Sequence, residues 1–204
     1  MKSQYKAGDF TLSEQEVKII IHSTNSFRDR TILKALYYAG LRREEVTELN
    51  VKDIDFNHRR INVVGKFEKS RIVPFFDFEF MGDLKHLIGE RKEGKVFCKT
   101  DDSKLTTRMI NKIVMKAGEK ANIQHPNPNM KHINPHLFRH SIARHLKSKG
   151  LQIEAIQNFL GHASFKTTMD TYGRMGIDEM QLHFNKKFNL IEDKREKGEI
   201  AIRD

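Results

Sequence analysis

The chain has 204 residues, which is enough for one well-packed core, and 38% of them are hydrophobic and 31% charged. It contains no apolar run long enough to cross a bilayer, and its single cysteine, Cys98, excludes an internal disulfide, so we expect a cytoplasmic protein. The net charge is +10, and residues 103–174 carry most of it, with 12 Lys and Arg against 3 Asp and Glu. A cationic stretch so poor in acids indicates a polyanionic partner such as nucleic acid.

Three helices are predicted in the first fifty residues. Ser13 and Glu16 have the spacing of a capping box, which marks the start of a helix with one apolar face. Ser26 can cap a second helix, and Gly40 is its natural end because glycine readily adopts the conformation that terminates helices. A short helix over 43–49 follows.

Alternation of apolar and polar residues replaces helical spacing after residue 53. It predicts strands over 54–56, 61–64 and 71–74, with a hairpin near 65–70, and therefore a small antiparallel sheet. A helix is expected over 80–89, and residues 95–98 are expected to form a strand or an extended edge.

A basic stripe is the main feature of the helix predicted over 104–121. Cationic residues recur at every fourth position, beside an apolar face that contains Ile110 and Ile113. The stripe consists of Lys104, Arg108, Lys112, Lys116 and Lys120. Because like charges in one line repel one another, we interpret the stripe as a DNA-binding surface; a solvated helix face is the alternative.

Most of the remaining chain is also predicted to be helical. A proline-rich loop over 125–134 precedes a helix that starts at Pro135 and ends near Gly150. Shorter helices are expected over 153–160 and 165–172, and an amphipathic helix begins at Ile177. Residues 191–204 form a charged tail that we expect to be disordered.

Several histidines in the basic region suggest a metal site as one alternative. The four histidines are His132, His136, His140 and His145, and the first three follow one another at intervals of four residues. A zinc site needs three or four ligands, usually including cysteine or carboxylate, and this region is nearly free of both. We therefore expect no metal.

His136 and Arg139 share one face at the start of a predicted helix, where free N–H groups favour a bound phosphate. They belong to one of five short motifs. In chain order these are Ala39-Gly-Leu-Arg-Arg-Glu-Glu45, Val64-Gly-Lys-Phe-Glu-Lys-Ser-Arg-Ile-Val-Pro74, Pro135-His-Leu-Phe-Arg-His140, Leu160-Gly-His162 and Thr167-Thr-Met-Asp-Thr-Tyr172. Together they resemble the motifs of the tyrosine site-specific recombinase (phage integrase) family, and the resemblance extends from about residue 11 to residue 188.

This resemblance implies a fold that is mainly α with a small antiparallel β-sheet (α+β), like the catalytic domain of tyrosine recombinases and type IB topoisomerases. The domain would cover residues 11–190, after an extension of residues 1–10. The implied activity is site-specific DNA recombination, in which strands are cleaved and rejoined through a covalent 3′-phosphotyrosine without metal, ATP or another cofactor. The implied catalytic residues are Arg42, Lys66, His136, Arg139, His162 and Tyr172, with Glu45 supporting Arg42.

The chemistry of these residue types agrees with that activity. Charge builds up on the non-bridging oxygens of a phosphodiester transition state, and each arginine can donate to two oxygens at once. The ordinary pKa of a tyrosine is about 10, so Tyr172 needs cationic surroundings, and His136 can accept its proton. Lys66 would protonate the leaving 5′ oxygen. Phe67 stands where the family usually has a second glycine, which leaves Lys69 as a rival for that role.

The resemblance also predicts the partners. They are double-stranded DNA and, when two DNA sites are paired, further copies of the chain. The free protein is expected to be a monomer, and the expected location is the cytoplasm, in association with the nucleoid. The helix from Ile177 would dock on a neighbouring protomer, or fold back in the free protein. Family members usually carry an N-terminal DNA-clamping domain, so we expect either an excised catalytic domain or a minimal enzyme. The alternative functions are DNA relaxation of the type IB topoisomerase kind and a catalytically silent DNA-binding regulator.

Overall fold

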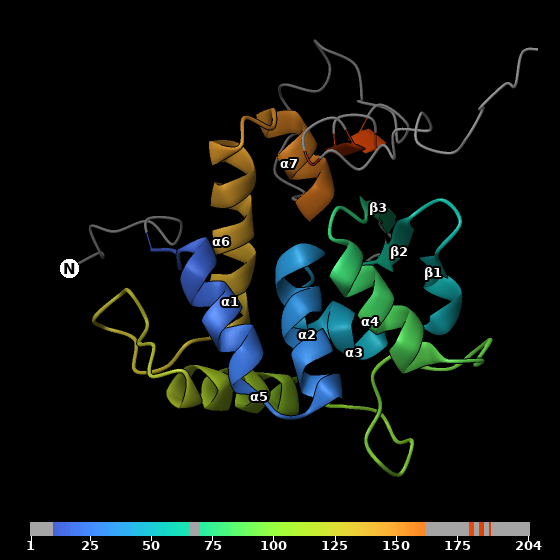
Figure 1. Cartoon of the computed structure of the whole chain (residues 1–204), viewed down its shortest axis with the longest axis horizontal. Coiled ribbons are helices and arrows are strands. Elements are labelled where there is room, and N and C mark those ends of the chain that lie inside the picture. Colours follow the sequence, from blue (N-terminus) through green and yellow to red (C-terminus); the bar gives the residue numbers. More distant parts are fainter. Residues whose placement is uncertain (1–9, 66–69, 162–179, 182–183, 186–187, 189–204) are drawn as a thin grey trace, which may run out of the picture.

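A computed structural model describes residues 10–65, 70–161, 180–181, 184–185 and 188 of the protein. The elements in this part of the chain are α1 (Glu14–Ser23), α2 (Phe27–Tyr38), α3 (Arg43–Glu48), a 3-10 helix (Val51–Asp53), β1 (Ile54–Asp55), β2 (Arg60–Val64), β3 (Ser70–Pro74), α4 (Phe78–Ile88), α5 (Thr107–Lys120), α6 (Pro135–Ser148) and α7 (Ile153–Leu160). The protein is mainly helical with one small antiparallel sheet, as the sequence predicted (Figure 1). None of the described helices is long and apolar enough to span a membrane.

Local capping interactions fix the first helices where the sequence predicted them. Ser13 Oγ accepts a hydrogen bond from the Glu16 amide at 3.2 Å, and the Glu16 carboxylate accepts one from the Ser13 amide at 2.7 Å. Ser26 caps α2 by accepting from the Asp29 amide at 3.2 Å. Because these bonds satisfy amides that have no partner inside the helix, they set the first residue of each helix.

Helix α2 is the centre of the fold. Seven consecutive residues, Thr31–Tyr37, are buried, which requires neighbours on every side of the helix. Those neighbours are α1, α3, α4, α5 and α6 (Figure 1). The chain leaves α2 at Gly40, whose φ of 55° is a left-handed conformation that glycine adopts without strain. This exit carries the next residues toward α7 and the candidate site.

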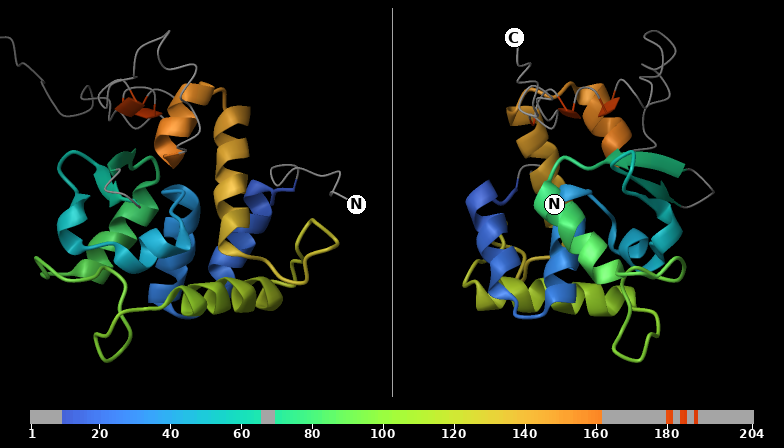
Figure 2. Two further views of the ribbon diagram at one scale, coloured as in Figure 1. Left: turned by 180° about the vertical axis from the view of Figure 1, so that it is seen from behind. Right: turned by 45° about the vertical axis from the view of Figure 1, so that its right-hand side comes forward.

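The sheet lies on one side of α2 and α4, whereas α1 and α6 lie on the other (Figure 2). Its strands are antiparallel in the order β1-β2-β3, with Ile61 opposite Val73 and Val64 opposite Ser70. Ile61, Val63 and Val73 are buried, so one face of this hairpin belongs to the core. The hairpin also packs against α7 through β3.

Two predicted boundaries were wrong by two or three residues, in each case because of a capping side chain. Helix α4 begins at Phe78 because Asp77 accepts from the Phe80 amide at 2.7 Å. Helix α5 begins at Thr107 because Thr106 caps it, so Lys104 precedes the helix on which the sequence placed it. Residues 95–98 make only single bridges, from Lys95 to Asn50 and from Cys98 to Lys104, and form the extended edge instead of a strand.

The apolar side of the C-terminal segment folds back on its own domain. Residues 180, 181, 184, 185 and 188 are helical, and Met180 and Phe184 are buried. The ring centroid of Phe184 lies 5.3 Å from that of Phe76 and 5.4 Å from that of Phe159. This arrangement agrees with the expectation for a free protein; Ile177, the predicted start of this helix, lies outside the described residues.

Candidate active site

Arg139 is a buried arginine that joins the ends of two other helices. It lies in the second turn of α6, whose start is fixed by Asn134, which accepts from the Leu137 amide at 3.1 Å. Its guanidinium donates hydrogen bonds to the carbonyls of Gly40 and Leu160. Burial, together with the positive charges of Arg42 and Arg71, lowers the pKa of Arg139 to about 9, so the side chain still carries its charge at neutral pH.

Arg42 reaches the same place from the start of α3. Its guanidinium donates to Glu45 Oε1 at 2.9 Å and to the Gly161 carbonyl at 3.3 Å, and its amide donates to Glu45 Oε2 at 2.7 Å. The side chain remains 35% exposed, whereas that of Glu45 is only 5% exposed. Glu45 therefore holds Arg42 from the protein side and leaves part of the guanidinium open to solvent.

A third arginine, Arg71 on β3, was not predicted as a site residue from the sequence. Its guanidinium binds both oxygens of Glu45, at 2.6 and 2.8 Å, and its Nε donates to the Phe159 carbonyl at 2.9 Å. The signal that could have revealed it is alternation: Arg71 lies two residues from the buried Val73, and so on the same face of β3. A charged residue at an inward-facing position requires a partner of opposite charge.

Glu45 is the common acceptor of this cluster. Burial alone would raise the pKa of its carboxyl, but the hydrogen bonds and positive charges of Arg71 and Arg42 lower the pKa to about 2. The carboxylate is therefore ionised at any physiological pH. With Arg42, Arg71 and Arg139 around one carboxylate, the site has a surplus of positive charge, which suits a phosphate.

Comparison of the chain with known proteins identifies its family. The model of the phage integrase family matches residues 11–176. The chain belongs to the phage integrase family. It is 36% identical over 160 residues to the tyrosine recombinase XerC of Proteus mirabilis, covering 76% of this chain and 50% of that protein. It is 31% identical over 164 residues to the tyrosine recombinase XerA of Pyrococcus horikoshii, covering 78% of this chain and 54% of that protein.

Solved structures of recombinases have the same fold. A crystal structure of XerA recombinase matches with a TM-score of 0.67 and 28% identity, over 86% of this chain and 64% of that one. The XerH site-specific recombinase bound to its difH substrate, in a pre-cleavage complex, matches with a TM-score of 0.65 and 27% identity, over 76% of this chain and 47% of that one. This phage integrase family member spans about half the length of the curated relatives it matches.

Within this family member, the described part of the site brings together Arg42, Glu45 and Arg139 and adds Arg71. His136 is exposed in the first turn of α6, one turn before Arg139. Lys66, Lys69, His162 and Tyr172 lie outside the described residues. The roles given to these four residues therefore remain predictions.

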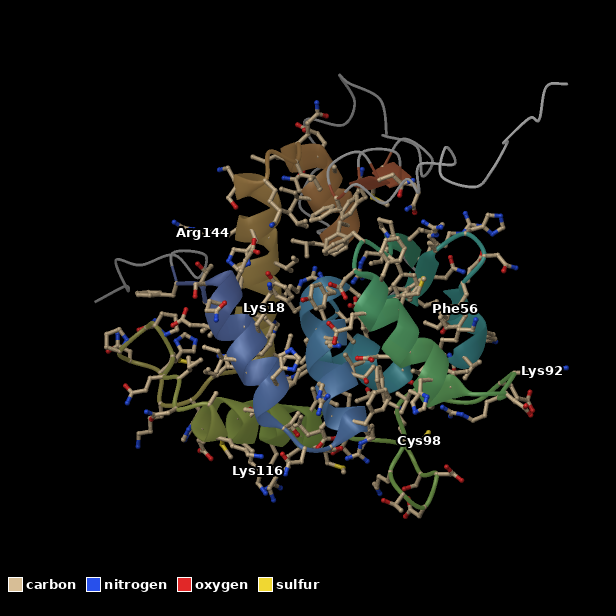
Figure 3. The ribbon with its side chains drawn as sticks, in the orientation of Figure 1. Lys18, Phe56, Lys92, Cys98, Lys116 and Arg144 are labelled. Carbon is tan, nitrogen blue, oxygen red and sulfur yellow. The ribbon has the colours of Figure 1, made fainter. Side chains whose placement is uncertain are left out.

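Most of the predicted basic stripe is exposed on α5. Arg108, Lys112, Lys116 and Lys120 are exposed residues of the helix, and Figure 3 shows Lys116 at the lower edge of the molecule. Lys112, Lys116 and Lys120 border a cavity of about 330 Å³ together with Thr24 and Arg28, at the start of α2. Arg139, by contrast, binds Gly40, just past the end of α2. Twelve helical residues separate the two ends of α2, a distance of roughly 18 Å.

Two members of the stripe differ from its centre. Lys104, which precedes the helix, forms an ion pair with Glu48, and Lys120 donates to Asn25 Oδ1 at 2.9 Å. The histidines considered as metal ligands are engaged singly: His132 lies 3.3 Å from Glu119, and His145 Nδ1 lies 2.7 Å from the Tyr37 hydroxyl. Among the described residues, no group of His, Cys, Asp or Glu could hold a metal ion.

Proposed function

We propose that this chain cleaves and rejoins DNA at specific sites through a covalent phosphotyrosine on Tyr172. The observation that carries the proposal is the arginine cluster at Glu45. Arg42 and Arg71 bind its carboxylate, and the buried Arg139 adds a third positive charge nearby, in the helix whose first turn holds His136. Such a surplus of fixed positive charge can neutralise the charge that develops on a phosphodiester in its transition state. The recombinases to which the chain is similar support the same activity.

Each predicted residue has one task in this reaction. The Tyr172 hydroxyl attacks the phosphorus, His136 accepts the phenolic proton, and the bond between phosphorus and the 5′ oxygen breaks as Lys66 donates a proton to that oxygen. Arg42, Arg139 and His162 donate to the non-bridging oxygens. Because the phosphotyrosine conserves the energy of the phosphodiester, a 5′ hydroxyl can reverse the reaction without ATP.

The substrate is double-stranded DNA of the nucleoid, and the active form is a homo-oligomer on paired sites. The stripe on α5 would contact the DNA backbone away from the cleaved phosphate, because it borders the start of α2 whereas Arg139 binds Gly40 just past the other end. A monomer is proposed for the free protein because Met180 and Phe184 are buried against its own domain. In the assembly the same apolar side would dock on a neighbouring protomer.

The test is covalent capture on DNA. A duplex that binds the chain is first selected from a random-sequence pool and then given a nick, so that cleavage releases a short fragment and traps the adduct. We expect the unmutated chain to form the adduct, and Tyr172→Phe to bind the duplex equally well but form none. An adduct in Tyr172→Phe would contradict the proposed nucleophile. Relaxation of supercoiled plasmid without joining of two sites would indicate topoisomerase activity instead.

The identity of the general acid needs a separate test. A substrate with sulfur at the bridging 5′ position has a leaving group that needs no proton, so loss of the acid no longer matters. Lys66→Ala should slow cleavage of the oxygen substrate about 10²–10⁴-fold and cleave the sulfur substrate at nearly the unmutated rate. If Lys69→Ala shows this rescue and Lys66→Ala does not, Lys69 is the acid.

A further inference from the structure

We propose that Arg71 is a positioning residue of the active site: it fixes the guanidinium of Arg42 and the end of α7 in one geometry. The inference deepens the proposed function and rests on it for its catalytic consequence. Arg71 belongs to the second of the five sequence motifs, but the resemblance gave it no role. In this protein its side chain is only 9% exposed.

The first observation is the way in which Glu45 is shared. Arg71 binds both carboxylate oxygens, at 2.6 and 2.8 Å, and so fixes the plane of the carboxylate. Arg42 donates to the same oxygens through its guanidinium and its amide, at 2.9 and 2.7 Å. The position of the half-exposed Arg42 is thus determined by a carboxylate that Arg71 holds. A lysine in place of Arg71 could bind only one oxygen and would leave the carboxylate free to rotate.

The second observation is at the C-terminus of α7, where three consecutive carbonyls each accept from a different arginine. The pairs are Phe159 with Arg71, Leu160 with Arg139 and Gly161 with Arg42. Carbonyls at the end of a helix have no partner inside it and carry the negative end of its dipole, so cations there are stabilising. The same three arginines therefore connect β3, α3 and α6 to the last residues of α7 and to Gly161, which precedes His162 in the chain.

The third observation explains why a glycine occupies position 161. Its φ is 61°, and a Cβ built there would lie 2.7 Å from Cδ of Arg71, a contact too short for any side chain. The Arg71 side chain passes directly over the Gly161 backbone on its way to Glu45 and Phe159. The close approach and the left-handed backbone together favour glycine at position 161, because glycine leaves room for the Arg71 side chain.

These contacts give Arg71 a role beyond stability. It lies on β3, the strand that follows the predicted general acid in the hairpin, and it binds elements that carry Arg42 and Arg139. A displacement of about 1 Å in such a site can cost about 10²-fold in rate. We therefore expect loss of Arg71 to slow the chemical step itself, without changing the affinity for DNA.

The experiment compares Arg71→Lys with Arg60→Lys in single-turnover cleavage at saturating DNA. Arg60 is the matched control because it also lies in the sheet and pairs with a carboxylate, that of Asp55, at 3.3 Å. We expect Arg71→Lys to lower the cleavage rate constant about 10²-fold on both the oxygen and the bridging-sulfur substrate, with the dissociation constant for DNA unchanged within about threefold. Arg60→Lys should cleave at the unmutated rate.

The rate constant separates positioning from folding. A residue needed only for stability would lower the fraction of protein that reacts but not the rate constant of the part that does. The double variant Arg71→Lys with Glu45→Gln should be little slower than Glu45→Gln alone, because both changes disrupt the same interaction between Arg71 and Glu45. Full rescue on sulfur would mean that Arg71 acts through the general acid, and an unmutated rate constant in Arg71→Lys would mean that it positions nothing; either result overturns the inference.

A second readout does not depend on cleavage. In the DNA-free protein, side-chain NMR should show hindered rotation of the Arg42 guanidinium, and Arg71→Lys should average those signals while Arg60→Lys leaves them unchanged. If the unmutated chain forms no adduct but this averaging occurs, the proposed function fails and the positioning by Arg71 stands. If the Arg42 signals do not change in Arg71→Lys, the inference is overturned whatever the activity.

Discussion

Two buried charge clusters in this protein have opposite compositions. In the first cluster, the Glu45 carboxylate binds Arg42 and Arg71, and Arg139 adds a third positive charge nearby. In the other cluster, Lys34 of α2 donates to Glu79 and Asp83 of α4, each at 2.6 Å. The Lys34 side chain is 2% exposed and Glu45 is 5% exposed, so both central groups are removed from water. The Glu45 cluster has a surplus of positive charge and includes the partly exposed Arg42, whereas the Lys34 cluster has a surplus of negative charge.

The difference separates a binding site from a structural connection. All of the positive charge of Lys34 is used by two carboxylates on the neighbouring helix, so the cluster joins α2 to α4 and offers nothing to a ligand. The Glu45 cluster keeps positive charge that no described carboxylate neutralises, and one of its arginines faces solvent. A protein gains no stability from burying uncompensated charge, so the surplus positive charge indicates that the site binds an anionic ligand.

The largest effect should come from removing a cation of the surplus. Arg139→Ala is expected to slow DNA cleavage about 10³-fold, because the proposed mechanism uses Arg139 as a preorganised donor to the phosphate. Arg139→Lys should recover only part of this loss, since lysine cannot bind two carbonyls in the arginine geometry. Single-turnover cleavage at saturating DNA measures the effect. An equal loss in Lys34→Met, corrected for the folded fraction, would show that the two clusters do not differ in function.

The second prediction concerns the Lys34 cluster. Lys34→Ala should lower the free energy of unfolding by about 3 kcal/mol, because the buried ion pair with Asp83 is broken and the packing of the lysine stem is lost. Lys34→Met, which keeps most of the volume, should cost less. Urea unfolding at pH 7 measures both. If the stability of Lys34→Ala equals that of the unmutated protein, the ion pairs of Lys34 do not stabilise the contact between α2 and α4.

Features set by neighbours in the chain were predictable from the sequence. The capping box at Ser13 and the approach of Arg42 to Glu45 each depend on residues three positions apart, and the exit from α2 depends on a single glycine, Gly40. The starts of α4 and α5 were misplaced because the capping side chains of Asp77 and Thr106 were overlooked.

Contacts between distant parts of the chain were not predictable in the same way. Arg71 is 26 residues from Glu45 and 88 from Phe159, so no local spacing connects them. Lys104 was assigned to the stripe by its period, but its partner Glu48 is 56 residues away. The motifs identified the arginines, whereas the fold determined which carbonyls and carboxylates they meet.

The third prediction uses pH to measure how strongly the arginines hold Glu45. The folded-state pKa of about 2 lies below the ordinary value of 4.5, so the ionised carboxylate stabilises the fold above pH 4.5 and this contribution is lost as the pH falls toward 2. The loss should reach about 2 kcal/mol by pH 3.

Glu45→Gln provides the measurement, because it removes this carboxylate and leaves every other acid in place. The difference in unfolding free energy between the unmutated protein and Glu45→Gln should shrink between pH 5 and pH 3. Glu79→Gln is the control from the other cluster: Lys34 lowers the pKa of Glu79, but its side chain is 66% exposed and solvent screens the interaction. Equal slopes for the two variants would contradict the difference between the clusters.

The smallest effect tests whether surplus charge also marks a ligand on the protein surface. Lys112 and Lys116 are exposed at the centre of the α5 stripe, and no described carboxylate forms an ion pair with either of them, unlike Lys104. If they contact DNA phosphates, each releases about one counterion on binding, so Lys112→Gln with Lys116→Gln should flatten the slope of log affinity against log salt by roughly two units. The loss of affinity should be the same for every DNA sequence, because phosphate contacts carry no base information.

Lys85→Gln with Lys92→Gln is the control, since it removes the same charge from α4 and the loop after it, where Lys92 lies far from Lys116 (Figure 3). An equal change of slope in both pairs of variants would mean that the effect comes from net charge and not from the position of the stripe. An unchanged slope in the stripe variant would mean that this face of α5 does not contact DNA.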